Sequence, residues 1–323
     1  GEFTGISAIT DWRHPDPLAR CRPWNADYWG EYFEALDTIS VKQLKDYARF
    51  LIKKPKDALQ RYVWGKCYRD ADYYTDFIGT KLMAQGKFSE AIPYLEKVSI
   101  RFLNTQNIAP YARQRSYGME RWQTKQKLKG GLDDFAPSLT TNKKLDFCRH
   151  ILAVQQLYQN MRPSDQRRQK AYELASLYYQ ASYLGDCWWL TQYGVSMAQD
   201  SAKAGDMDFV AHAIGLLEES AQSANFSLRQ KSLYALAFIP RDSWYKQGWD
   251  GVLGVYYDRN HLVARPASRQ YRAMMQLSEF ARENDGQLAP YISRCEELKA
   301  FERVRLTSQP LAWHRVLDVL RVE

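Results

Sequence analysis

The sequence predicts an all-α protein made of stacked antiparallel helical hairpins with irregular insertions. Apolar residues recur at helical spacing along most of the 323 residues. Short loops separate these periodic segments, as expected for antiparallel neighbours. The chain has only 17 Gly and 12 Pro, which disfavours an all-β fold built from many tight turns. This length fits two compact domains or one extended helical array, and essentially no sheet is expected.

The first predicted helix begins after Ser40, a residue type that caps helix N-termini. Pro55 ends it, because proline has no backbone N–H to donate. The residues predicted on its buried face are Val41, Leu44, Tyr47, Ala48 and Leu51. A second helix is predicted over Lys56–Tyr68.

The later helices follow from the same apolar period. They are predicted over Lys143–Met161, Gln169–Tyr183, Asp186–Ala202, Met207–Ser223, Ser227–Ile239, Ala267–Asn284, Gly286–Val304 and Leu311–Val322.

Irregular stretches divide the chain into six predicted segments. They are an irregular Pro/Trp-rich lead-in (1–39), helical hairpins with a repeat-like unit (40–103), a basic insertion or connector (104–141), a helical repeat region (142–239), an aromatic and Gly-containing loop (240–266) and C-terminal helices (267–323). A short hairpin is one possibility for the aromatic loop.

The stretch from Phe77 to Val98 has small residues where two helices must touch. Ile78-Gly79 and Leu82 belong to its first helix, and Gly86 occupies the turn, where a left-handed conformation is expected. Side chains of little bulk allow helix axes to approach closely. The second helix contributes the close-contact Ala91 and the apolar Leu95 and Val98.

This spacing resembles a tetratricopeptide repeat, although the family's early aromatic and terminal proline fall at Thr75 and Leu103. A partial second copy has Leu174-Ala175 as the apolar-small pair, Cys187 at the close contact and Gly194 at the later small position. The resemblance implies a right-handed superhelix whose concave face holds a protein segment, a peptide or another extended ligand. It therefore implies a non-enzymatic binding or scaffold module.

Candidate contact residues on such a face are the aromatic Tyr74 and Trp122 and the cationic Lys81 and Arg113. Arg115 is a further candidate, because it belongs to a basic segment from Arg101 to Lys129 that interleaves cations with aromatic rings. Single-stranded nucleic-acid binders combine these groups, so an anion or nucleic-acid binder is the first alternative function. A solvated connector explains the same charges equally well.

A cysteine peptidase is the second alternative. Leu184 to Leu190 resembles the segment around the catalytic cysteine of calpain-type peptidases, with Cys187 as the nucleophile. That family has Gln six residues before the cysteine, where this chain has Ala181. No His lies in a matching context, and a buried packing role for Cys187 explains the residue better.

Other chemistry finds little support in the sequence. The five cysteines are scattered without C-x-x-C spacing, which indicates neither a zinc site nor a redox motif, and no cofactor is predicted. The net charge of +8 permits anionic partners without specifying nucleic acid. Gly1-Glu2-Phe3 resembles a cloning remnant, so the natural start is expected to have been replaced, and a leader, an anchor or an upstream domain are the candidates for the missing part. This favours an exported or surface-anchored protein, such as a lipoprotein.

Overall fold

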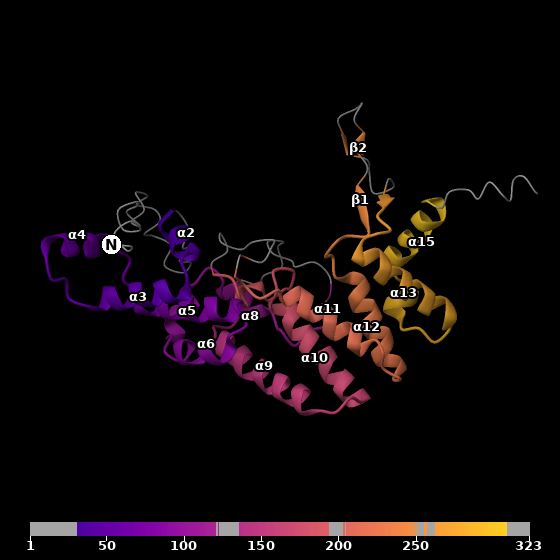
Figure 1. Ribbon diagram of the computed structural model, residues 1–323, viewed down its shortest axis with the longest axis horizontal. Helices are drawn as coiled ribbons and strands as arrows, with labels where there is room; N and C mark the ends of the chain where they lie inside the picture. Colours follow the sequence, from indigo (N-terminus) through magenta and orange to yellow (C-terminus); the bar gives the residue numbers. More distant parts are fainter. Residues whose placement is uncertain are drawn as a thin grey trace, which may run out of the picture. The chain divides into compact units, whose positions relative to one another are not determined.

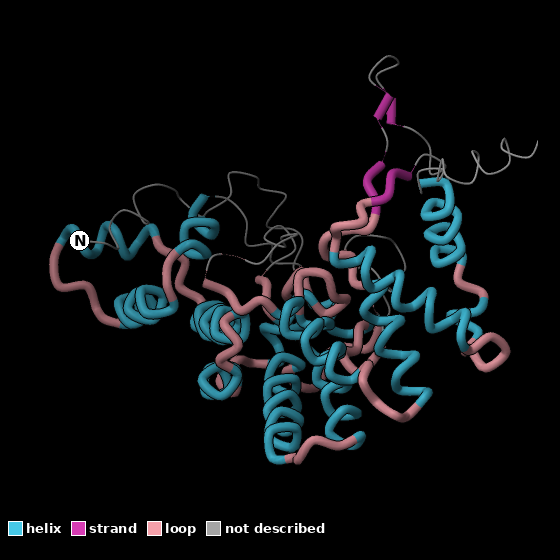
Figure 2. Tube along the Cα trace, turned by 45° about the vertical axis from the view of Figure 1, so that its right-hand side comes forward, coloured by secondary structure: helices cyan, strands magenta, loops and turns pink. Residues whose placement is uncertain are grey.

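The computed structural model describes residues 31–120, 122, 136–193, 203, 205–247, 249–250, 255–256 and 262–308. Within them the protein is mostly helical, which confirms the predicted all-α class (Figure 1; Figure 2). The chain divides into two compact units, Gly1–Met161 with Glu173–Ala213, and Arg162–Tyr172 with Ile214–Glu323.

The described part of the first unit opens with a short helix and four further helices. These elements are α2 (Glu31–Thr38), α3 (Val41–Ile52), α4 (Ala58–Lys66), α5 (Ala71–Ala84) and α6 (Phe88–Leu95), of which α5 and α6 pack together as a hairpin. Two short helices, α7 (Ile100–Thr105) and α8 (Ala109–Gln114), precede the long α9 (Lys143–Asn160). Helix α10 (Asp165–Ala181) crosses the boundary of the units, and the 3-10 helix η2 (Trp188–Leu190) follows it.

Helix α3 forms where the sequence predicts it. The Ser40 hydroxyl accepts from the backbone N–H of Gln43, and the Gln43 side chain accepts from the Ser40 N–H, so both orphan donors are satisfied. Its apolar stripe is buried, and Trp64 of α4 donates its indole N–H to the Leu51 carbonyl at 2.8 Å. This bond fixes α4 against the C-terminal end of α3.

Glycine allows α5 and α6 to pack closely. A Cβ on Gly79 would lie 2.6 Å from Leu95 Cδ2, too close for an ordinary contact. Gly86, at φ +73°, ends the first helix, with its N–H bonded to the Met83 carbonyl and the Lys87 N–H bonded to the Leu82 carbonyl. These two bonds form a Schellman motif, which satisfies carbonyls left open at a helix end. Ala91 and Leu95 are fully buried.

Helix α9 is tied to this hairpin through its N-cap. Asn142 accepts from the N–H groups of Lys144 and Leu145 and donates its amide N–H to the Leu95 carbonyl at 2.9 Å. One side chain thus satisfies open N–H groups at the start of α9 and an open carbonyl at the end of α6. Lys144 then enters the interior and forms an ion pair with Asp76 of α5.

An aromatic cluster fills the core beside α2, α3 and α5. The hydroxyl groups of Tyr32 and Tyr47 are 2.8 Å apart, and those of Tyr32 and Tyr74 are 3.0 Å apart. Tyr73 and Tyr193 meet edge to face, with their ring centroids 5.3 Å apart. Aromatic side chains here serve as packing groups, each with a large buried area and oriented ring contacts.

The described part of the second unit consists of helices and two short antiparallel pairs of strands. Its elements are α11 (Phe209–Ser220), which begins in the first unit, α12 (Phe226–Phe238), β1 (Tyr245–Gln247), β2 (Trp249–Asp250), β3 (Val255–Tyr256), β4 (Leu262–Ala264), α13 (Arg269–Glu283), α14 (Pro290–Ser293) and α15 (Glu296–Ser308). β1 pairs antiparallel with β4, with Tyr245 opposite Ala264, and β2 pairs with β3.

Arg269 at the start of α13 locks the end of α12. Its guanidinium donates to the carbonyls of Leu236 and Ile239 at 3.0 and 2.6 Å, which lie in the last turn and C-cap of α12. Asp242, at φ +52°, accepts from the Arg269 backbone N–H at 2.7 Å. Helix α13 therefore begins against the end of α12.

Several predicted elements differ from the structure. The helix predicted over Asp186–Ala202 is wrong in its described part, where η2 takes its place. The Cys187 N–H bonds back to the Gln180 carbonyl at 3.0 Å, and a Cβ on Gly185 would lie 2.2 Å from the Tyr179 carbonyl oxygen. This tight turn prevents a regular helix from starting there.

The structure also differs from the prediction in one helix that is divided and in helices that lie within segments predicted to be irregular. The helix predicted over Gly286–Val304 is two helices, α14 and α15, because Gly286 adopts φ +85° and Pro290 starts a new helix at its N1 position. Helix α2 lies in the lead-in predicted to be irregular, and α7 and α8 bring helical structure into the start of the basic insertion. Residues 1–30 and the predicted helix Leu311–Val322 lie outside the described residues.

Candidate functional site

A groove on the first unit is lined by α3, the N-terminal half of α5, and Tyr94 with Lys97 at the end of α6. It encloses about 520 Å³. Helix α5 contacts both α3 and α6 (Figure 1), and the groove follows these contacts. Clefts of about 300–1,000 Å³ are typical of ligand-binding pockets in proteins.

The floor and walls of the groove are mainly apolar. Leu51, Tyr74 and Ile78 are buried and form its floor. Ile52, at the last position of α3, is 82% exposed at its edge, and Tyr94 stands half-buried on the side of α6. An exposed branched side chain beside an apolar floor is typical of a contact surface.

Cations surround this apolar surface. Lys45, Arg49, Arg69 and Lys97 line the groove, against the single carboxylate of Asp70. Asp70 caps α5 by accepting from the N–H of Asp72 at 2.9 Å, and Arg49 pairs with Asp46. No carboxylate in the described part of the chain pairs with Lys45, Arg69 or Lys97.

Two of these cations are held over aromatic rings. The Lys45 Nζ lies 4.8 Å from the centroid of Tyr94, and the Arg69 guanidinium carbon lies 3.8 Å from that of Trp64. Cation–π contacts orient a charge without neutralising it. The rim of the groove therefore carries directed positive charge.

Tyr74 is the one predicted contact residue that lines this groove. Its hydroxyl donates to the Tyr68 carbonyl at 2.8 Å, and burial raises its pKa well above the usual value for tyrosine. The ring therefore contributes shape and apolar surface to the floor, while its polar atom is occupied inside the protein.

Lys81 lies apart from the groove. Its Nζ donates to the Asp37 backbone carbonyl at 2.6 Å and is 3.9 Å from the Asp37 carboxylate, with which Lys203 also pairs. Desolvation by burial lowers the pKa of Lys81, and Asp37 opposes that effect. These contacts give Lys81 an internal role that joins α5 to the end of α2.

The other predicted contacts are also engaged within the protein. Arg113 donates to the carbonyl and side-chain oxygen of Asn104, and Arg115 pairs with Asp186 at 3.1 Å. Trp122 is buried and tilts against Tyr179, with 5.2 Å between ring centroids. The nucleic-acid alternative requires stacking rings at the surface, whereas Trp122 packs inside. Of its further cations, Arg121, Lys125, Lys127 and Lys129 lie outside the described residues.

The partial second repeat and the peptidase alternative both depend on Cys187. Ala175 and Cys187 are fully buried, as a packing role requires, while Gly194 lies outside the described residues. Burial raises the pKa of the Cys187 thiol to about 12, and Asp186 adds to the effect. A nucleophilic cysteine needs a depressed pKa, so this environment favours the packing role.

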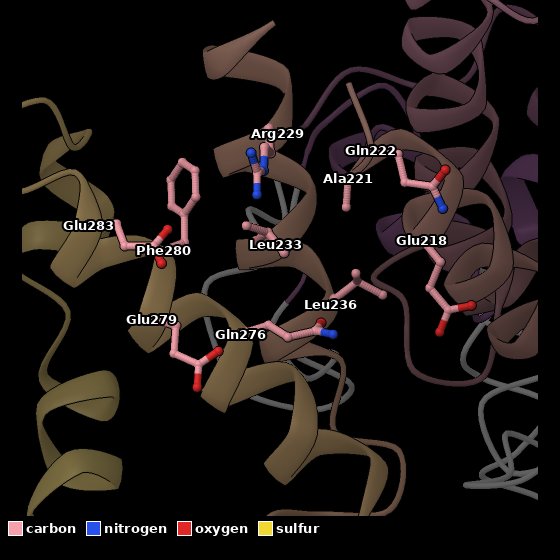
Figure 3. Close-up of a pocket in the computed structure, with 10 residues that line it drawn as sticks. All are labelled: Glu218, Ala221, Gln222, Arg229, Leu233, Leu236, Gln276, Glu279, Phe280 and Glu283. Atoms are coloured by element: carbon pink, nitrogen blue, oxygen red, sulfur yellow. The ribbon is translucent and has the colours of Figure 1, made fainter. Parts of the chain in front are cut away.

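The second unit has a groove of a different kind, about 580 Å³ in volume (Figure 3). Leu233, Leu236 and Phe280 contribute its buried apolar surface. Three exposed carboxylates line it: Glu218 from α11, and Glu279 and Glu283 from α13. Arg229 lies with its guanidinium carbon 5.3 Å from the Phe280 ring centroid, so the one cation is held at that ring.

The described part of the chain contains no group of three or more His, Cys, Asp or Glu side chains that could hold a metal ion. None of its helices is long and apolar enough to cross a bilayer.

Sequence reasoning missed Ile52, Tyr94 and Lys97 as residues of a common site. They belong to different helices, and only the contact of α5 with both α3 and α6 brings them together. One signal was available, because Ile52 adds a second apolar residue directly after Leu51, outside the helical stripe. Comparison of the chain with family models, curated proteins and solved structures finds no match.

Proposed function

We propose that this protein is a non-enzymatic binding module in which the groove between α3, α5 and α6 holds an extended segment of a partner protein. The observation that carries this proposal is the apolar groove itself, with Ile52 exposed at its edge. Apolar surface left open to water is costly, and a partner's side chains would remove it from water.

The arrangement of the helices supports the proposal. Helices α5 and α6 pack together as a hairpin, and α5 also contacts α3. Arrays of tetratricopeptide-like hairpins bind ligands on the surface presented by successive first helices. The close packing at Gly79 and the turn at Gly86 are consistent with such a repeat.

The test begins with panning a displayed peptide library on the whole protein and measuring the affinity of an enriched peptide by titration. Ala71→Trp then fills the groove from an exposed position at the start of α5. Ala58→Trp is the matched control, because Ala58 is also exposed, lies at the first position of α4 and does not line the groove.

We expect Ala71→Trp to weaken peptide binding by about tenfold or more, because the tryptophan fills the groove. A tenfold loss of affinity corresponds to about 1.4 kcal/mol. Ala58→Trp should leave the affinity within about twofold. Equal affinities for the wild type and Ala71→Trp, or a library without any enriched peptide, would contradict the proposed function.

A further inference from the structure

We propose that the segment held in this groove is acidic, with aspartate or glutamate residues flanking apolar side chains. The inference rests on the proposed function and adds the chemical class of the partner. Its basis is the combination of an apolar floor with directed positive charge at the rim.

Part of the positive charge at the rim of the groove is not paired with any carboxylate that the structure describes. Lys45, Arg69 and Lys97 have no carboxylate partner within the described residues, and the Asp70 carboxylate caps α5. Tyr94 holds Lys45 and Trp64 holds Arg69, so these charges are oriented before a ligand arrives. Preorganised charge lowers the ordering cost of binding.

The floor of the groove favours a ligand with apolar side chains. Leu51, Tyr74 and Ile78 present apolar surface in the space that the cations surround. A nucleic acid or a simple anion would match the rim but would leave this surface without an apolar partner. A peptide with leucine or phenylalanine between its carboxylates matches both parts.

The grooves of the two units differ in the sign of their charged residues. The groove of the second unit has three carboxylates and one arginine around its apolar residues (Figure 3). An acidic segment is repelled there and attracted by the groove of the first unit. Charge complementarity thus distinguishes two cavities of similar volume, about 580 and 520 Å³.

The experiment uses the full chain and a fluorescein-labelled peptide in which leucine and phenylalanine alternate with glutamate. A twin peptide has glutamine in place of every glutamate. Fluorescence anisotropy gives both affinities at low and at high salt. The double variant Arg69→Gln with Lys97→Gln removes two rim charges, and Lys42→Gln with Lys87→Gln removes the same charge from exposed positions outside the groove.

We expect the glutamate peptide to bind about tenfold more tightly than its twin at low salt, because several weak ion pairs act together. The advantage should shrink at high salt, where exposed charges are screened. The double variant Arg69→Gln with Lys97→Gln should lose most of this advantage of the glutamate peptide. The control Lys42→Gln with Lys87→Gln should retain it. Ile52→Ser should weaken the glutamate peptide, and the control Leu59→Ser, also at an exposed apolar residue, should not.

Three outcomes would overturn the inference. Equal binding of both peptides, lost in Ala71→Trp, would leave the proposed function standing and refute the acidic partner. Binding of neither peptide would also refute it, and library panning would then decide the function separately. Displacement of the peptide by polyuridine, with no effect of Ile52→Ser, would assign the rim charges to a polyanion instead.

Discussion

Lys144 of α9 and Asp76 of α5 form an ion pair inside the first unit, with 2.8 Å between Nζ and Oδ2. Both side chains are almost completely buried. The same ammonium donates to the Thr80 hydroxyl at 2.7 Å and lies 5.0 Å from the ring centroid of Tyr193. This pair connects α5, which lines the groove, to α9.

Removing one partner of this pair is expected to destabilise the first unit strongly. Lys144→Met leaves the Asp76 carboxylate buried without its cation, which costs about 3–5 kcal/mol. Urea unfolding measures the change, with Arg149→Met as control because Arg149 forms an exposed pair with Glu96. That control should cost less than about 1 kcal/mol. A similar small loss for Lys144→Met would show that the pair contributes little.

Close packing at Gly79 gives a second prediction. Gly79→Ala places a methyl group 2.6 Å from Leu95 Cδ2, so Leu95 must move and stability should fall by about 1–3 kcal/mol. Gly65→Ala is the matched control in α4, where a Cβ meets nothing within 4 Å. Replacing that helical glycine should stabilise the protein by about 0.5–1 kcal/mol. Thermal unfolding of the two variants should therefore shift in opposite directions.

The local part of this fold was predictable from the sequence. Ser40 and Pro55 mark the ends of the α3 segment, and Gly79 and Gly86 mark a tight hairpin, because caps, breakers and small residues act within a few positions of the chain. Lys144 gave no such signal. Its partner lies 68 positions away, and only tertiary packing makes that lysine a core residue.

The segment after Gly185 shows why an apolar pattern can mislead. Trp188, Trp189 and Leu190 suit a helix, yet their large side chains are buried in a 3-10 turn. The groove was harder to predict from the sequence than the helices, because its lining residues come from three helices. The sequence predicts Tyr74 as an aromatic contact, but it does not show which residues of the neighbouring helices form a groove around Tyr74.

Thiol labelling tests the environment of Cys187. Burial raises its pKa to about 12, so almost no thiolate exists near neutral pH. Iodoacetamide at about pH 8 should leave Cys187 unmodified in the native protein, because the thiolate is the nucleophile. Peptide mass spectrometry after labelling in urea supplies the positive control. Rapid native labelling would instead support an activated cysteine and return the peptidase alternative to consideration.

Acid sensitivity of the second unit should depend on Asp165. Its Oδ1 accepts from the Ser223 hydroxyl at 2.8 Å, from Arg168 at 3.1 Å and from the Ala224 N–H at 3.2 Å, and these bonds lower its pKa. A lowered folded pKa adds stability above the unfolded value of about 4, which disappears as pH falls through the folded pKa.

Asp165→Asn should therefore destabilise the protein at neutral pH and flatten the loss of stability on the acid side. Urea midpoints across this pH range measure both effects. The exposed Asp285→Asn serves as control and should keep the wild-type pH profile. An unchanged profile in Asp165→Asn would assign the acid sensitivity to other carboxylates.

Hydrogen–deuterium exchange of the full chain, with and without the glutamate-bearing peptide, shows which helices the bound peptide covers. We expect the peptide to slow amide exchange in the C-terminal half of α3, the start of α5 and the end of α6, because these segments line the groove. Exchange in α12 and α13 should stay unchanged. Protection confined to α12 and α13, or absent from α3 and α5 despite peptide binding, would contradict binding in this groove.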